Sequence, residues 1–203
     1  MSKLGSSDNP LKVAIVGAGP SGFYAADALI TSDLKVEVNL IEKLCAPYGL
    51  VRTGVAPDHP LIKKSIEKFA VMAEPEEFNY FGNVAVGKDI TVDQLKESHH
   101  AVIITMGAET DRKLGIPGED LKGSHTATEF VAWYNGHPEY REREFDLSHE
   151  TAVIIGQGNV AADVARILSK TVDELKCTDI SQHALDVLEG SKVKNIYVVG
   201  RRG

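Results

Sequence analysis

The chain is 203 residues long and carries a formal charge of −7, with 43% hydrophobic and 25% charged residues. This length and composition are typical of a globular protein with one domain or two small ones. The acidic balance argues against a nucleic-acid-binding protein, which needs a basic surface. No apolar run reaches the roughly 18 residues that a membrane-spanning helix needs, so no membrane span is expected.

The N-terminal segment and the two cysteines bear on targeting and on the redox state of the compartment. Residues 1–9 are polar and show neither the apolar core of a secretory signal nor the Arg-rich pattern of a transit peptide. Cys45 and Cys177 lie far apart and in no metal-ligand spacing. We interpret them as free thiols in a reducing compartment and expect no metal site.

A βαβ unit begins the chain. Residues 12–17 are a short apolar, β-branched run that predicts a buried parallel strand. Residues 22–30 have the apolar spacing of a helix, and residues 35–41 alternate as a second strand does. The connections are short, as expected of a βαβ unit.

A loop, two helices, a hairpin and a strand are expected next. Residues 44–60 are rich in Gly and Pro and too long for a plain connector, which predicts a functional loop. Residues 61–72 have the pattern of an amphipathic helix, and residues 79–87 predict a hairpin with its turn at Gly82-Asn83. A short helix and a buried strand are then expected over residues 92–98 and 101–106.

The second half starts with a surface turn over residues 116–120 and a short helix over residues 128–135, in which Trp133 and Tyr134 are expected to be packing residues. Residues 136–150 are polar and charged, which is typical of a boundary or linker.

The strand–turn–helix pattern then repeats. A strand is expected over residues 151–155, a glycine turn over 156–159 and a helix over 160–168. Residues 169–192 are interpreted as a charged insertion before a strand over residues 195–199. The repeat predicts an α/β fold with two Rossmann-like dinucleotide-binding units, built of parallel sheets with helices on both faces. A doubly wound sheet needs more strands than the second unit supplies, so we expect a fragment that lacks the C-terminal part of the fold.

The first glycine turn has the residues that a pyrophosphate site needs. Its sequence is Gly17-Ala18-Gly19-Pro20-Ser21-Gly22, between a strand and a helix. The first glycine permits the tight turn, the second lets the pyrophosphate approach the backbone, and the third lets helix and strand pack closely. Glu42 ends the next strand, where an acid accepts hydrogen bonds from an adenosine ribose.

The second glycine turn, Gly156-Gln157-Gly158-Asn159-Val160-Ala161, repeats the pattern with Ala at the third small position. The strand after it ends in Arg201-Arg202 instead of an acid. Two guanidiniums favour the 2′-phosphate of NADP, because Arg binds phosphate through paired, charge-assisted hydrogen bonds. An exposed Arg pair in a loop is the alternative. Two dinucleotide sites in one chain suit a flavin that takes a hydride from a nicotinamide, and FAD takes the first unit by analogy.

Six segments of the sequence resemble the adrenodoxin reductase and bacterial ferredoxin–NADP reductase family. They are VAIVGAGPSGFY, YGLVRTGVAPDHP, FGNV, GIPGEDLKG, GQGNVAADVAR and VVGRRG. The resemblance covers nearly the whole chain. It implies an enzyme of the EC 1.18.1 class that passes electrons from NADPH through FAD to a [2Fe–2S] ferredoxin-type protein. The sequence does not fix the oligomeric state, for which we expect a monomer. A bacterial cytoplasm and a mitochondrial matrix both suit such an enzyme.

The same resemblance assigns site residues. It implies an FAD-binding domain over residues 1–106 and an incomplete NADP-binding domain over residues 107–203, with the linker near 136–150. FAD contacts are expected from Gly17, Gly19, Pro20, Ser21, Gly22, Glu42, Leu50 and Val86. NADP contacts are expected from Gly156, Gln157, Gly158, Asn159, Val160, Arg201 and Arg202.

Asp58 and His59 lie in the loop that the resemblance places near the flavin. One hypothesis gives them an acid–base role, and the other makes them positioning residues that cap the following helix. Arg166 is interpreted as a solvated residue of its helix.

The sequence is compatible with two alternative functions, and a third lacks the motif that it needs. A truncated, non-catalytic dinucleotide-binding module or assembly subunit would bind a dinucleotide without moving electrons. A reductase like the glutamate synthase small subunit shares the two-dinucleotide pattern. A thioredoxin reductase-like enzyme would need a C-x-x-C pair, which the sequence does not contain.

Overall fold

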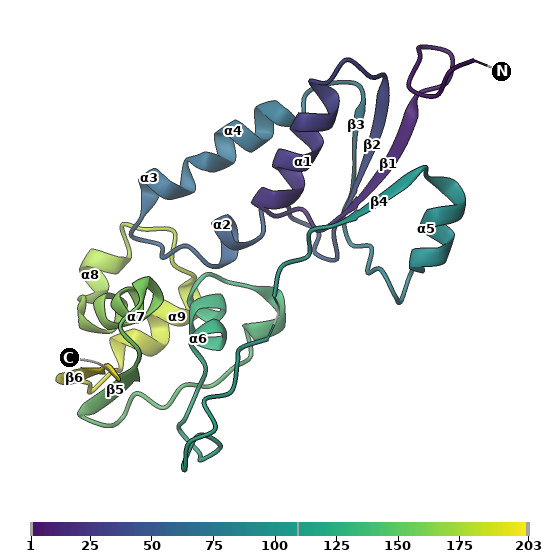
Figure 1. Cartoon of the computed structure of the whole chain (residues 1–203). Coiled ribbons are helices and arrows are strands. Elements are labelled where there is room, and N and C mark those ends of the chain that lie inside the picture. Colours follow the sequence, from purple (N-terminus) through teal and green to yellow (C-terminus); the bar gives the residue numbers. More distant parts are fainter. Residues whose placement is uncertain (1, 109, 202–203) are drawn as a thin grey trace. The chain divides into compact units, whose positions relative to one another are not determined.

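The computed structural model describes residues 2–108 and 110–201 (Figure 1). Its chain forms two compact units. Unit 1 comprises Met1–Arg52 and Leu61–Ala108, and unit 2 comprises Thr53–Pro60 and Glu109–Gly203. The segment Thr53–Pro60 therefore packs with the second half of the sequence although unit 1 flanks it on both sides.

Unit 1 is built on a four-stranded parallel sheet with the order β3-β2-β1-β4. Its strands are β1 (Leu11–Val16), β2 (Val36–Ile41), β3 (Phe78–Phe81) and β4 (Ala101–Ile104). In the central strand, Val13 is paired with Val38 on one side and Ala101 on the other. A strand buried on both faces needs a continuous apolar run, which explains the sequence V-A-I-V in β1.

Helices cover both faces of this sheet. Two of them, α1 (Pro20–Ile30) and α4 (Ser65–Met72), pack Phe23 and Phe69 against one face. On the other face, α5 (Val92–Ser98) packs Leu95 against β1 and β2. A capping box at Thr91 and Gln94 fixes the start of α5.

The helix expected over residues 61–72 is divided. It forms α3 (Pro60–Lys63) and α4, and a turn at Lys64 separates them. The Ser65 hydroxyl donates to the Ile62 carbonyl over 2.7 Å and so competes with the helical backbone at this point.

The hairpin prediction for residues 79–87 is wrong, because β3 pairs with β2 in parallel. Asn83 has φ 59, and its N–H donates to the Leu44 carbonyl over 3.0 Å. The chain therefore turns around the end of β2 and does not fold back on β3. Phe78 and Tyr80 pack on the α1 face, whereas Val84 and Val86 pack with Leu95.

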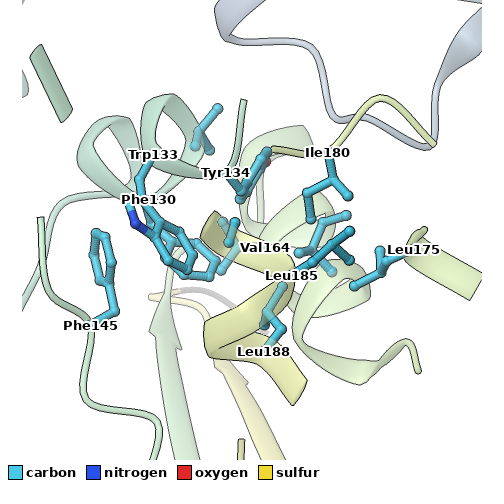
Figure 2. Close-up of a cluster of buried hydrophobic side chains, with 12 residues drawn as sticks. Phe130, Trp133, Tyr134, Phe145, Val164, Leu175, Ile180, Leu185 and Leu188 are labelled. Carbon is cyan, nitrogen blue, oxygen red and sulfur yellow. The ribbon is translucent and has the colours of Figure 1, made fainter. Parts of the chain in front are cut away.

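Unit 2 contains a two-stranded parallel sheet of β5 (Thr151–Ile155) and β6 (Asn195–Val199). Its helices are α6 (Ala127–Tyr134), the 3-10 turn η1 (Pro138–Tyr140), α7 (Asn159–Ser169), α8 (Val172–Leu175) and α9 (Gln182–Glu189). Figure 2 shows the core between them, where Trp133 and Tyr134 are 1% and 0% exposed. The prediction that these two residues serve packing is confirmed.

The stretch over residues 169–192 belongs to this core. Leu175 of α8 and Leu185 and Leu188 of α9 pack against Trp133 and its neighbours. The stretch interpreted as a charged insertion therefore supplies buried residues to the core of unit 2. Residues 136–150, expected as a linker, lie inside unit 2 and add Phe145 to the same core.

Within the described residues, no helix has the length and apolar character that crossing a membrane requires.

Candidate functional site: two glycine turns and a charged loop anchor

The first glycine turn connects the carboxyl end of β1 to α1. The Gly17 N–H donates to the Ile41 carbonyl at the end of β2, and the Thr105 N–H donates to the Val16 carbonyl, both over 2.8 Å. Three parallel strands therefore end together around the turn, which is where α/β sheets bind ligands.

The three glycines of this turn have different surroundings. A Cβ at Gly17, where φ is +104, would lie 2.7 Å from the Thr105 carbonyl oxygen. A Cβ at Gly22 would lie 2.2 Å from the Gly17 oxygen, so helix and strand touch there. At Gly19 the nearest protein atom would be 4.0 Å away, at Gly49. This pattern is the one that the pyrophosphate prediction requires, with open space only at the second glycine.

Helix α1 presents its positive end at the turn. Gly19 is its N-cap and makes no side-chain cap, Pro20 stands in the first turn, and no acidic residue lies there. Ser21, which follows Pro20, is exposed. An anion would therefore meet the helix dipole without competition from a carboxylate.

Glu42 follows β2 and its carboxylate reaches the turn. Oε2 accepts from the Ala18 N–H over 2.8 Å, and Oε1 accepts from the Leu44 N–H over 3.1 Å. Burial, and then the charge of Glu42, raise the pKa of Tyr80 to about 12. The carboxylate for which ribose binding was predicted thus connects the turn to the loop after β2.

Leu50 and Val86 lie on segments that reach the same end of the sheet. Leu50 begins α2 (Leu50–Thr53) and is 71% exposed. Val86 is half-buried beside β1 and β2, and the nearby Val84 N–H donates to the Glu42 carbonyl over 2.9 Å. Unit 1 therefore brings together all the segments that were predicted to contact FAD.

The second glycine turn connects β5 to α7. The Gly156 N–H donates to the Val199 carbonyl at the end of β6 over 2.9 Å, and φ of Gly156 is +135. A Cβ at Gly156 or at Gly158, the N-cap of α7, would meet no atom within 4 Å. The first turn of α7, which holds Asn159 and Val160, contains no acid. This turn is therefore open around both glycines.

The end of β6 meets this turn. The side chain of Gln157 lies so close to Gly200 that a Cβ there would be 2.2 Å from Gln157 Cδ. Arg201 follows and is exposed. Arg202 lies outside the described residues.

A charged anchor joins the segment Thr53–Pro60 to α7 within unit 2. Asp58, whose side chain is 5% exposed, accepts from Arg166 through both oxygens, over 2.5 Å from Nε and 2.7 Å from Nη2. Lys170 Nζ donates to Oδ2 over 2.7 Å. The interpretation of Arg166 as a solvated residue was therefore wrong. A partner 108 positions away in sequence binds its guanidinium.

This pairing sets the charge of Asp58. Hydrogen bonding to Arg166, assisted by Lys170, holds the pKa of Asp58 well below its usual range, against the opposite effect of burial. The hydrogen bonds to Asp58 and then to Asp163 raise the pKa of Arg166. Asp58 is therefore ionised throughout the physiological range and serves as an acceptor, not as a proton donor.

His59 extends the anchor. Its Nε2 lies 2.8 Å from Arg166 Nη2 and 3.2 Å from Asp163 Oδ1. One ring nitrogen cannot accept from the arginine and donate to the aspartate at once, so the two contacts compete. Nearby, the Tyr134 hydroxyl is buried without a hydrogen-bond partner among the described residues, and burial raises the pKa of Tyr134.

The sequence had indicated both glycine turns but not the anchor or the residues that buttress the first turn. Arg166 and Lys170 carried a weak signal for it, as cations four positions apart at the end of a helix. Thr105 and Gly49 could not be identified from the sequence, which shows only that Thr105 is near a strand end and that Gly49 belongs to a Gly-rich loop.

Comparison with known proteins agrees with this description. The sequence matches the pyridine nucleotide-disulphide oxidoreductase family over residues 11–198. It is 55% identical to the mitochondrial NADPH:adrenodoxin oxidoreductase of Salvelinus fontinalis, over 95% of this chain and 39% of that protein. It is 50% identical to the NADPH-ferredoxin reductase FprA of Mycobacterium leprae, over 94% of this chain and 43% of that one.

A solved structure of Mycobacterium tuberculosis FprA in complex with NADPH superposes with a TM-score of 0.93 at 50% identity, over 96% of this chain and 44% of that one. The chain thus spans well under half the length of these relatives. The predicted α/β fold and the resemblance to adrenodoxin reductases and bacterial ferredoxin reductases are confirmed. The chain belongs to the pyridine nucleotide-disulphide oxidoreductase family.

Proposed function

We propose that this chain is the N-terminal part of a ferredoxin–NADP reductase, which passes electrons from NADPH through FAD to a ferredoxin-type protein. The observation that carries the proposal is the pair of glycine turns. Each follows a parallel strand and begins an 11-residue helix with no acid in its first turn. Two such sites suit hydride transfer from a nicotinamide to a flavin. Names of relatives, which include NADPH:adrenodoxin oxidoreductase and NADPH-ferredoxin reductase, support the direction of this chemistry.

Unit 1 would hold FAD. The pyrophosphate would approach Gly19, where an added Cβ would have no protein atom closer than 4.0 Å, and the helix dipole at Ser21 would face it. Gly17 and Gly22 would shape the turn, Glu42 would accept from the ribose, and Leu50 and Val86 would border the site.

Unit 2 would hold NADP(H). Its pyrophosphate would lie at residues 156–160, where Gly156 and Gly158 leave the surface open. Arg201, together with Arg202, would bind the 2′-phosphate through charge-assisted hydrogen bonds. The side chain of Gln157, which lies over Gly200, would hold the end of β6 beside the turn.

Asp58 would act as a positioning residue, because two cations occupy its carboxylate and keep it ionised. This geometry favours the positioning hypothesis over an acid–base role for Asp58. It leaves His59 with a ring nitrogen between a donor and an acceptor.

We further propose a [2Fe–2S] partner, a monomeric state and a location in a bacterial cytoplasm or a mitochondrial matrix. Relatives named as mitochondrial and relatives from bacteria support both locations. The rival function is a dinucleotide-binding module that moves no electrons. It is supported by the coverage of the relatives, because this chain spans only 39% and 43% of the two reductases named above.

The test is a visible spectrum of the purified chain with and without added FAD, followed by NADPH under anaerobic conditions. Flavin peaks that bleach with NADPH are the expected result. Flavin retained without bleaching would favour the non-catalytic module, and a folded chain that never retains FAD would overturn the proposal. Gly19→Ala is the matched control. Its added methyl group would lie no closer than 4.0 Å to any protein atom, the nearest being Gly49 Cα, but it would crowd the bound ligand.

A further inference from the structure

A second glycine backbone lies directly against the first glycine turn. The Tyr48 N–H donates to the Ala18 carbonyl over 2.7 Å, which attaches the loop after β2 to the middle of the turn. At the next residue, a Cβ on Gly49 would lie 2.9 Å from Gly19 Cα and 3.6 Å from Gly19 N. The obstructing atoms are backbone, so the two segments could not both keep their places around a side chain at Gly49.

The loop is held in this position from its other side. Tyr48 has φ 88, a left-handed conformation that side chains rarely adopt, and its ring centroid lies 5.3 Å from that of Phe23. The Arg52 guanidinium lies 5.3 Å from the centroid of the same ring, and its Nε donates to the Pro47 carbonyl over 3.0 Å. Strain at a non-glycine residue persists only where the surroundings fix it, and here an aromatic cluster and a cation do so.

We infer that Gly49 is a positioning residue for FAD, which seats the loop backbone against Gly19 and so completes the wall of the pyrophosphate site from outside the glycine turn. The inference rests on the proposed function. Gly19 is the glycine with open space around it, and the nearest protein atom to that space belongs to Gly49. Any displacement of the loop therefore changes the site at the point where the ligand would come closest.

Gly87, another glycine of unit 1, serves as a control that distinguishes the effect of backbone conformation from the effect of a steric clash. Gly87 has φ +96, but a Cβ there would meet nothing within 4 Å. Substitution at Gly87 therefore imposes strain without a clash. At Gly49, with φ +47, the conformation is one that Asn adopts more readily than Ala, whereas the clash is the same for both.

The experiment measures the Kd of FAD for the apoprotein, by quenching of free FAD fluorescence, and the Tm of each apoprotein. Gly49→Ala and Gly49→Asn are each expected to weaken FAD binding at least 10-fold, while Gly87→Ala stays within twofold of the unsubstituted chain. Equal Kd values for Gly49→Ala and the unsubstituted chain would overturn the inference. So would recovery in Gly49→Asn alone, because conformation and not contact would then explain the glycine.

Arg52→Met provides an independent measurement should the Gly49 variants fail to fold. Arg52 is exposed, so its loss spares the core while it releases Pro47 and the Tyr48 ring. About threefold weaker FAD binding is expected, and an unchanged Kd would overturn the inference. If the unsubstituted chain folds but binds no FAD, the proposed function and the inference are both refuted. If the unsubstituted chain binds FAD and the variants bind it equally well, only the inference about Gly49 is refuted.

Discussion

Replacement of Asp58 by Asn should weaken unit 2 by about 2 kcal/mol. The carboxylate is 5% exposed and accepts hydrogen bonds from two cations, and bonds to charged groups contribute about 1.5–3 kcal/mol each. Arg166 and Lys170 are 31% and 27% exposed, so solvent screens part of the interaction. The neutral amide retains one acceptor, which also keeps the expected loss near the lower part of that range.

Trp133 makes this change measurable in unit 2 alone. It is the one tryptophan of the sequence, and it lies 1% exposed in the core of that unit. With a urea m-value of about 1–2 kcal/mol/M, a loss of about 2 kcal/mol lowers the fluorescence midpoint by about 1–2 M. Asp173→Asn is the matched control, because Asp173 pairs with Lys176 over the same 2.5 Å but is 84% exposed. The control should not move the midpoint.

The pH dependence gives a second signature. Asp58 has a depressed pKa in the folded state, so its stabilisation is full above the unfolded pKa of about 3.9 and is lost as pH falls toward the folded value. The difference between Asp58→Asn and the unsubstituted chain should stay constant from about pH 8 to 5 and shrink only below about pH 4. A midpoint for Asp58→Asn that equals that of Asp173→Asn at pH 7 would refute the reasoning.

Three further predictions concern single contacts. Gly22→Ala should prevent soluble expression or lower Tm sharply, since its Cβ would lie 2.2 Å from a carbonyl oxygen, whereas Gly158→Ala should leave Tm unchanged and weaken NADPH binding; equal Tm values would contradict this. Arg201→Ala should reduce the preference for NADPH over NADH by about 10–100-fold in binding titrations, as expected for one charge-assisted contact, and an unchanged preference would exclude Arg201 from the 2′-phosphate site. Tyr134→Phe should leave urea stability equal or raise it by about 1–2 kcal/mol, because it removes a buried hydroxyl without a partner among the described residues; a loss would reveal an unseen hydrogen bond.

Local chemistry made the glycine turns and several elements predictable from the sequence. The strands β5 and β6 and the helix α5 have the predicted bounds, since each combines an unambiguous period with a clear turn or cap. The hairpin failed because Gly82-Asn83 suits more than one turn, and the partner of β3 lies some 40 positions earlier in the chain. The direction of the chain after β3 is therefore set by the pairing of β3 with β2, which the local sequence does not show.

Long-range contacts set the limit of the prediction. The charges in residues 169–192 obscured apolar positions such as Leu175 and Leu185, whose burial depends on Trp133 and its helix. Arg166 looked solvated because its partner, Asp58, lies in a distant loop. Gly49 could not be separated from the other glycines of its loop without the position of Gly19.

The separation of Asp58 from Arg166 also has a consequence during synthesis. The two residues are 108 positions apart, so at about 5–20 residues per second a ribosome completes Asp58 about 5–20 s before its partner exists. The second segment of unit 1, Leu61–Ala108, is synthesised entirely during that wait. Asp58 is therefore without Arg166 and Lys170 while the remainder of unit 1 is synthesised, and its ion pairs form only after the end of α7 has been made.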